Sequence, residues 1–177
     1  GREALGARGT PVHGTERMRR LLEGNEPWRR LVVEGRIELR DAASVDLGGL
    51  RAEAVPVPHR DELSDTVGFL VTGPRARLLW LPDIDSWDGW DRDLREVVSS
   101  VDRAFLDATF LSDGEIGGRR LAEVPHPRAL DTMERLSGLG DRVRLVHLNH
   151  TNPLLVDPSP AERRGFRVAR EGETLEL

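Results

Sequence analysis

The stretch Arg77–Asp85, RLLWLPDID, places an apolar run directly before Pro82 and two aspartates, Asp83 and Asp85. The residues Arg77–Leu81 have the length and composition of a β-strand that is buried between two layers of a fold. An aspartate that follows a strand most often caps a turn, so neither carboxylate alone identifies a site. The segment predicts a central strand, and its polar end becomes informative only if other strands end in the same way.

Segments of similar length precede this strand, with Gly or Pro between them. Together with Arg77–Leu81, the following should form a largely antiparallel meander: Arg36–Leu39, Leu50–Val57 and Thr66–Thr72. Nearer the start of the chain, Thr15 is placed to cap a helix over Glu16–Leu22.

In the second half of the chain, helices and strands alternate. Helices are expected over Asp88–Val98 and Pro127–Leu136, strands over Arg103–Leu106 and Arg142–Leu148, and a closing pair of short strands at FRVA (166–169) and TLEL (174–177). A meander that is followed by alternating elements predicts an α/β fold class.

The composition excludes several kinds of site. The chain has 177 residues and no cysteine, so disulfides and thiolate zinc sites are excluded, and a metal must be held by His and carboxylate groups. Acidic residues number 31 against 26 basic ones, all of them arginine, and we do not expect a nucleic-acid partner. No stretch is long and apolar enough to cross a bilayer. We expect one soluble domain over residues 1–177, a small-molecule substrate and no membrane partner; a cytoplasmic location is favoured, and a homodimer is possible.

Polar side chains recur where the expected strands end. They are His59 after AVPVP, Asp83 and Asp85 after LLWLP, Asp107 after AFL, and His150 after LVHLN. Strand ends at one edge of a sheet can converge in space although they are far apart in sequence, and dispersed His and Asp residues form metal sites in this way. The recurrence therefore indicates a site that no single residue would indicate.

Several of these segments together resemble the C-terminal part of a metallo-β-lactamase-fold hydrolase. The segments are VPHRDELSDTVGF (57–69), LPDIDSWDGW (81–90), DATF (107–110), EVPHPRALDTM (123–133) and HLNHTNPLL (147–155). The branch that they resemble most is the one similar to coenzyme PQQ synthesis protein B, and residues 11–32 resemble the segment after the first metal motif of that branch. The resemblance implies an αββα sandwich of which this chain holds the C-terminal two-thirds.

The resemblance also implies roles for individual residues. His59, Asp83 and His150 match the positions of metal ligands, with Asp83 bridging two metals. Asp107 and His126 match the acid and histidine that related nucleases use for proton transfer to the leaving group. Imidazole and carboxylate groups suit one or two Zn²⁺ ions, and Mn²⁺ or Fe is possible.

Structural roles remain open for the same residues. Asp107 can cap the turn after its strand, and His126, between two prolines, can be a rigid loop residue. His147 is expected inside a strand, where it packs rather than coordinates. Asp85 is expected either to cap the following segment or to orient a ligand.

One motif of the family is missing from the chain. The resemblance calls for a His-x-His-x-Asp-His run on an early loop, and no such run occurs, so we expect a fragment or a member that has lost the metal. The first expectation for function is a metal-dependent hydrolase that uses a metal-activated water on an ester, phosphodiester or related bond. The alternatives are a metal-dependent oxidative enzyme of the kind that serves PQQ biosynthesis, and a non-catalytic domain of the same fold.

Overall fold

The computed structural model describes residue 6 and residues 8–115 and 124–177. The helices and strands are β1 (Thr10–Gly14), α2 (Glu16–Gly24), α3 (Trp28–Val33), β2 (Ile37–Asp41), β3 (Ser44–Asp46), β4 (Arg51–Val57), β5 (Thr66–Thr72), β6 (Arg77–Leu81), α4 (Leu94–Ser99), β7 (Arg103–Asp107), α5 (Ala129–Arg135), β8 (Val143–Val146), α6 (Ser159–Glu162) and β9 (Arg167–Val168). Short 3₁₀ turns lie at Asp113–Glu115, Gly140–Arg142 and Pro153–Leu155.

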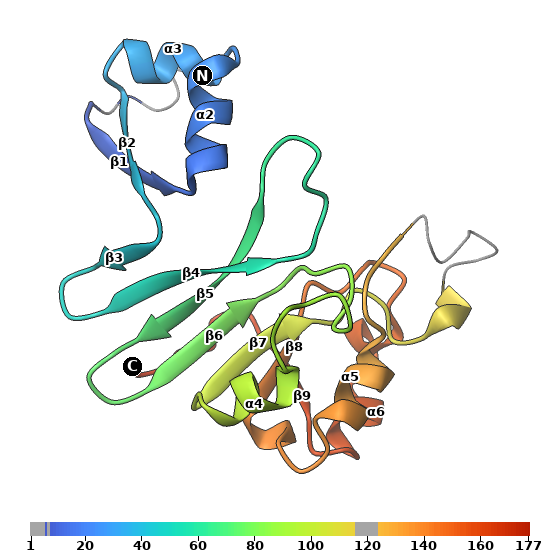
Figure 1. The fold of residues 1–177 in the computed structure, drawn as a ribbon. Helices are drawn as coiled ribbons and strands as arrows, with labels where there is room; N and C mark the ends of the chain where they lie inside the picture. The colour runs from blue at the N-terminus through green and yellow to red at the C-terminus, as the bar shows by residue number, and fades with distance from the viewer. Residues whose placement is uncertain (1–5, 7, 116–123) are drawn as a thin grey trace.

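Seven of the strands form one mixed sheet, in the order β3-β4-β5-β6-β7-β8-β9 (Figure 1). The pairs from β3 to β6 are antiparallel, which confirms the expected meander over β4, β5 and β6. From β6 to β9 the pairs are parallel, because helical or irregular segments return the chain to the same end of the sheet between strands. Since β4 and β6 both run antiparallel to β5, the carboxyl ends of β4, β6, β7 and β8 lie at one edge.

The core lies between this sheet and helices α4 and α5. Leu79 and Leu81 of β6 are fully buried and belong to the same apolar cluster as Val98 of α4 and Met133 of α5. The opposite face of the same strand carries Trp80, which is 40% exposed. The alternation follows from the period of two in a strand. It confirms RLLWL as a central strand, but the expected burial between two layers is wrong for the face that carries Trp80.

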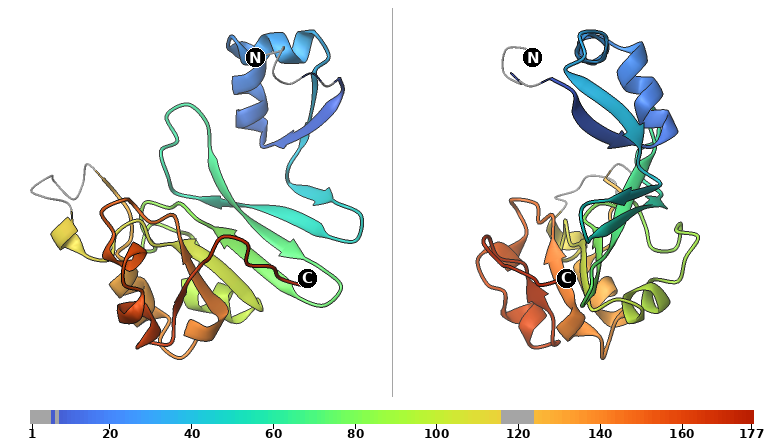
Figure 2. Two further views of the ribbon diagram at one scale, coloured as in Figure 1. Left: turned by 180° about the vertical axis from the view of Figure 1, so that it is seen from behind. Right: turned by 90° about the vertical axis from the view of Figure 1, so that its left-hand side faces the viewer.

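A smaller unit precedes the sheet. Strands β1 and β2 pair in parallel, from Thr10↔Ile37 to Gly14↔Asp41, with α2 and α3 between them, and Figures 1 and 2 show this unit set apart from the seven strands. Thr15 caps α2 as expected, its side-chain oxygen accepting from the Met18 amide at 3.2 Å. The segment RIEL does not join the meander, because the β-α-α-β connection returns it to β1 instead.

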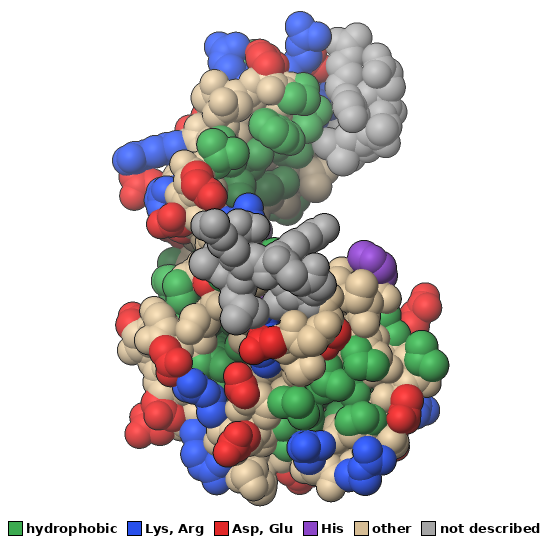
Figure 3. Space-filling model, turned by 90° about the vertical axis from the view of Figure 1, so that its right-hand side faces the viewer, with side chains coloured by type: hydrophobic (Ala, Val, Ile, Leu, Met, Phe, Trp, Pro, Cys, Tyr) green, Lys and Arg blue, Asp and Glu red, His purple; other side chains and the backbone are tan. Residues whose placement is uncertain are grey.

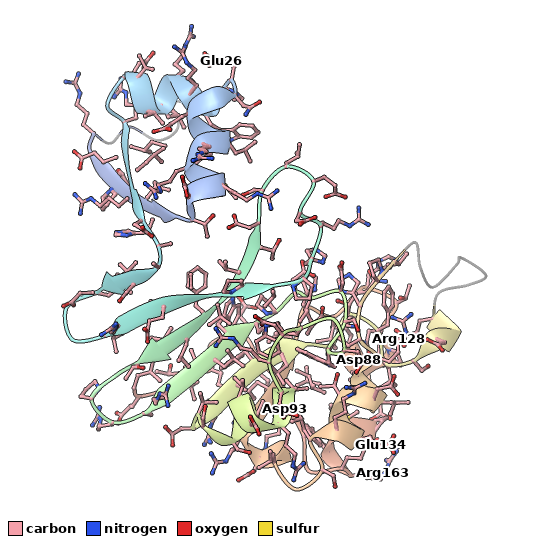
Figure 4. All side chains as sticks on the ribbon, in the orientation of Figure 1. Glu26, Asp88, Asp93, Arg128, Glu134 and Arg163 are labelled. Carbon is pink, nitrogen blue, oxygen red and sulfur yellow. The ribbon has the colours of Figure 1, made fainter. Side chains whose placement is uncertain are left out.

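Three other expectations change. The helix expected from Asp88 begins only at Leu94, with Asp93 as its cap (labelled in Figure 4), because the preceding segment is held in turns by the side chains of Asp88 and Trp90. The segment TLEL forms no strand among the described residues; it crosses the sheet and ends with Leu177 against Gly73. Strand β8, expected over Arg142–Leu148, is shorter and spans Val143–Val146.

Acidic and basic side chains are intermixed on the face shown in Figure 3. In the part of the chain that the structure describes, no helix has both the length and the apolar character that crossing a membrane requires. The expectation of a single domain over residues 1–177 stays a prediction.

Candidate metal centre

The candidate site lies at the edge where β4, β6, β7 and β8 end. His59 lies two residues after β4, Asp83 two residues after β6, Asp107 is the last residue of β7, and His147 directly follows β8. His126 reaches the same edge from the segment that leads into α5. Parallel strands place their carboxyl ends together, so residues that are nearly ninety positions apart meet here.

Asp83 lies at the centre of this group. Its Oδ2 atom is 3.2 Å from Nε2 of His59 and 4.0 Å from Nε2 of His147, and its Oδ1 atom is 3.6 Å from Nδ1 of His126. Oδ1 is buried and has no hydrogen-bond partner. A buried carboxylate oxygen without a partner is costly unless a cation occupies the space that it faces.

Asp85 holds His59 in place. Its Oδ1 atom lies 2.7 Å from Nδ1 of His59, and its backbone amide donates to the Pro58 carbonyl at 2.9 Å. With Nδ1 engaged, Nε2 is the free nitrogen, and it faces Asp83. A carboxylate behind a histidine is the arrangement that fixes the tautomer and direction of a metal ligand. This contact is the one that the orienting role expected for Asp85 requires.

Asp107 is fully buried, and both of its oxygens accept hydrogen bonds. Oδ1 accepts from the amide and hydroxyl of Thr109 at 2.8 and 2.7 Å, and Oδ2 accepts from the Ile84 amide at 3.1 Å and lies 2.8 Å from Nδ1 of His126. Burial opposes ionisation, but the surrounding groups of His126, His147 and Thr109 outweigh it and lower the pKa of Asp107 to about 2.

These contacts also set the tautomers of two histidines. Because Asp107 is an ionised acceptor, Nδ1 of His126 carries the proton and Nε2 is left free. The Thr109 hydroxyl donates to Asp107, so it accepts from Nδ1 of His147 at 2.9 Å, which leaves Nε2 of His147 facing Asp83. The nearby Asp107 carboxylate raises the pKa of His147, first as a hydrogen-bond acceptor and then through its charge, and the charge of Asp83 adds to this rise, against the opposing effect of partial burial.

The donor set suits a metal ion. One ligand atom from each of Asp83, Asp107, His126 and His147 lies within 4.8 Å of the others, and His59 adjoins Asp83. Imidazole and carboxylate are ligands that Zn²⁺, Mn²⁺ and Fe accept. The unpartnered Oδ1 of Asp83 points to the same conclusion independently. The residues therefore fit the metal that the sequence analysis expects, although the identity of the ion is not fixed by them.

The structure brings together four of the five residues that the sequence predicts for the site: His59, Asp83, Asp107 and His126. It places the fifth, His150, exposed in the turn after β8 and outside the group that surrounds Asp83. His147 takes the position facing Asp83 instead. The expectation that His147 packs inside a strand is wrong, because β8 ends one residue earlier and the backbone turns at His147 with φ 61°.

Two further charged residues, Arg128 and Asp113, lie near His126. Arg128, labelled in Figure 4 at the start of α5, donates to the His126 carbonyl at 2.6 Å, and its guanidinium lies 5.4 Å from the centre of the Phe110 ring. Asp113 accepts from the same guanidinium at 2.7 Å. The sequence analysis did not single out Arg128, and only its position two residues after His126 could have indicated it.

A sheet whose strands end in clustered His and Asp residues, with helices on its face, agrees with the metallo-β-lactamase fold that the sequence resemblance implies. Residues 2–150 match the family described as "Beta-lactamase superfamily domain", and the chain belongs to that family. Curated relatives are named coenzyme PQQ synthesis protein B. The chain is 32% identical to the one from Azotobacter vinelandii over 145 residues, which cover 72% of the chain and 47% of that protein. It is 34% identical to the one from Methylobacterium radiotolerans, with 74% and 52% covered.

Solved structures agree on the fold. A diphosphatase from the PhnP family superposes with a TM-score of 0.62 at 19% identity, covering 94% of this chain and 57% of that one. A possible metal-dependent hydrolase from Veillonella parvula superposes with a TM-score of 0.59 at 14% identity, covering 99% and 70%. These comparisons confirm the resemblance found in the sequence. The chain spans about half the length of the curated relatives that it matches.

Proposed function

We propose that the protein is a metal-dependent hydrolase in which a metal-activated water attacks an ester, phosphodiester or related bond. The observation that carries the proposal is the Asp83 carboxylate, which three imidazoles approach while its buried Oδ1 has no hydrogen-bond partner. Membership of the beta-lactamase superfamily and the hydrolase-like structural neighbours support the reaction class. The expected ion is Zn²⁺, one or two per chain.

We assign the ligand role to Asp83, His59 and His147. Both histidines direct Nε2 toward Asp83, and each has its Nδ1 occupied by another group, Asp85 for His59 and Thr109 for His147. When bound, a divalent ion lowers the pKa of a coordinated water toward ~7 and so supplies a nucleophile at neutral pH. The chain's part is to hold these side chains in position with little reorganisation.

Asp107 and His126 suit proton transfer better than metal binding. Both oxygens of Asp107 already accept hydrogen bonds, so a metal that bound Asp107 would have to displace them. Oδ1 of Asp83 has no hydrogen-bond partner to displace. Asp107 instead accepts from Nδ1 of His126 and so leaves Nε2 as the nitrogen that is directed away from it. His126 is then able to hold a second proton at Nε2 and give it to a leaving-group oxygen.

Two variants test the metal-ligand role of Asp83 and the proton-donor role of His126 separately. Replacing Asp83 by Asn is expected to remove bound zinc and, with it, hydrolysis of bis(p-nitrophenyl) phosphate or p-nitrophenyl acetate. A His126→Ala variant should keep its zinc and lose about 100-fold or more in kcat. His13→Ala, an exposed histidine of β1, is the matched control and should change neither quantity. Zinc retained by Asp83→Asn would contradict the proposal, and zinc bound without turnover of either probe would favour a non-catalytic domain.

The names of the curated relatives favour a second candidate, an oxidative role like that of enzymes for PQQ synthesis. The same ligands accept iron or copper, and open coordination positions could then bind oxygen rather than a hydrolytic water. Elemental analysis of the purified protein distinguishes the two. Zinc supports the hydrolase, whereas a single redox-active metal together with oxygen consumption supports the oxidative enzyme.

A further inference from the structure

We propose that helix α2 is a positioning element for the metal site, and that Arg17 and Thr15 set the affinity of His59 for the metal by holding the loop in which it lies. The inference rests on the proposed function, since it takes His59 as a ligand. It concerns the loop between β4 and β5, residues 58–65, which rises from the sheet toward α2 in Figure 1.

The loop turns sharply directly after His59. Arg60 has φ 25°, in a region that a residue with a side chain seldom adopts, and such a residue persists only where its surroundings hold it. Because Arg60 is bonded to His59, a change in the Arg60 conformation would shift the His59 backbone relative to Asp83. Contacts on both sides of Arg60 are therefore needed to maintain the position of the imidazole.

Contacts to the large sheet hold the side before the turn. The Thr66 hydroxyl donates to the His59 carbonyl at 2.9 Å, and the Asp85 amide donates to the Pro58 carbonyl at 2.9 Å. Both donors belong to segments that the seven-stranded sheet itself supports. They fix the backbone of His59 but do not reach the residues after Arg60.

Contacts to α2 hold the side after the turn. The Arg17 guanidinium donates to the Asp61 carbonyl at 2.6 Å, and a second nitrogen of the same group lies 3.8 Å from the Asp61 carboxylate. The Thr15 hydroxyl donates to Oδ1 of Asp65, which also accepts from Ser64 at 3.1 Å. The residue next to the strained turn and the last residue of the loop are thus both tied to α2.

This arrangement links two parts of the fold. Helix α2 belongs to the unit of β1 and β2, not to the sheet that carries Asp83, Asp107 and His147. A displacement of α2 would pull on Asp61 and, through Arg60, on His59. The position of the smaller unit therefore affects the position of His59, while Asp83 and His147 stay in place.

The first test compares two arginines of α2. Arg17→Ala removes both contacts to Asp61 and is expected to weaken zinc affinity by about tenfold, as loss of a group that orients a ligand does, and to change the visible absorption of the Co²⁺-substituted protein. Arg20→Ala is the matched control, because Arg20 is exposed and pairs with Glu16 inside the helix. Zinc affinity is measured by competition with a chromophoric chelator.

The second test uses the other contact. Asp65→Ala should weaken zinc affinity in the same way, whereas Asp65→Asn keeps an oxygen acceptor for Thr15 and should restore much of it. Native affinity and an unchanged Co²⁺ spectrum in both Arg17→Ala and Asp65→Ala would overturn the inference. So would an equal loss in Arg17→Ala and Arg20→Ala, which would indicate a general effect on the helix.

A further variant, at His59 itself, distinguishes failure of the positioning role from failure of the proposed metal site. His59→Ala should lose zinc affinity more strongly than either loop variant. If His59→Ala and Asp83→Asn both bind zinc like the native chain, the proposed metal site itself fails. If those two variants lose zinc and the variants of α2 and its loop do not, only the positioning role of α2 fails.

Discussion

At the scale of single residues, Asp83 and Asp107 show how different hydrogen-bond partners suit two similar acids to different roles. Asp83 lies two residues after β6, and Asp107 is the last residue of the neighbouring parallel strand β7; both carboxylates approach Nδ1 of His126, at 3.6 and 2.8 Å. Asp107 accepts hydrogen bonds on both oxygens, while one oxygen of Asp83 has no partner. The first is therefore suited to orient a histidine and the second to bind a cation.

His147 and His150 give a direct test at this scale. His147→Ala should lower zinc affinity at least about 100-fold, since a direct ligand contributes no less than the group that orients it. His150→Ala should leave zinc affinity within about twofold of the native value, because its exposed side chain lies outside the group around Asp83. Chelator competition measures both. The opposite ranking would restore the assignment that the sequence resemblance implies.

The role of Asp85 is tested through His59. Asp85→Ala frees Nδ1 of His59 and should weaken zinc binding by about 10–100-fold through loss of orientation. Asp91→Ala, which removes an exposed carboxylate a few residues along the chain, should have no effect. Isothermal titration with zinc compares the two variants. Equal affinities would mean that the ring of His59 needs no support from Asp85.

At the scale of elements, an ion pair joins the segment after β6 to helix α5. The carboxylate of Asp88 accepts from the Arg135 guanidinium through two bonds of 2.8 and 2.9 Å. The hydrogen bond and charge of Arg135 lower the pKa of Asp88 below its ordinary value of 3.8. The pair therefore contributes its stability above the pKa of the unfolded chain, and this contribution is lost as the pH falls through the lower pKa of the folded state.

Asp88→Asn should therefore melt slightly below the native protein at neutral pH. The difference in melting temperature should shrink as the pH falls below 3.8 and disappear below the lower pKa of the folded state, where Asp88 is protonated in both states. Thermal unfolding across a pH series measures it. A difference that stays constant with pH would show that Asp88 acts through something other than its charge.

Close packing between β5 and β6 gives a second test at the element scale. A Cβ atom at Gly68 would lie 2.8 Å from the Trp80 carbonyl oxygen and 3.2 Å from Cγ of Leu81. Gly68→Ala should therefore reduce the free energy of unfolding by about 1–3 kcal/mol, the usual cost of overpacking. Gly24→Ala, at the end of α2 with open space around it, should be neutral or stabilising. Urea unfolding compares them, and equal effects would contradict the packing argument.

At the scale of the whole molecule, the last residues cross the sheet on the side away from α4 and α5 (Figure 2). Glu173 accepts from Nε of Arg144 in β8 at 2.6 Å, and the Arg144 side chain is only 9% exposed. Arg144 lies on the same sheet face as Phe105 and Trp80, its neighbours across β7 and β6. The ion pair therefore anchors the C-terminal segment over a face that the helices leave open.

Glu173→Ala should destabilise the fold by about 1–3 kcal/mol, because it leaves a buried guanidinium without its carboxylate. Glu176→Ala is the control: Glu176 and its partner Arg75 are both exposed, and such pairs contribute about 0–1 kcal/mol. Chemical unfolding of the two variants gives the comparison. Similar losses in both would mean that Arg144 finds other acceptors when Glu173 is removed.

Much of the sheet could be predicted from the sequence, because period-two burial and Gly or Pro between strands are local signals. RLLWL and TVGFLVT became β6 and β5 with the expected bounds. The partner of RIEL could not be predicted, since a strand of four or five residues carries no mark of which neighbour it will pair with. The helix expected from Asp88 began late for a similar reason, because tertiary contacts of Asp88 and Trp90 override local propensity.

By itself the sequence determined which residue types could form a site and that they stand where strands end. His59, Asp83, Asp107 and His126 were found in this way, with the help of a family resemblance. Only the tertiary structure placed His147 beside Asp83 and left His150 outside the group, because these positions depend on where β8 ends and how the backbone turns after it. The direction in which each side chain points depends on strand register and on packing between distant segments. Neither of these can be predicted from the neighbouring residues in the sequence.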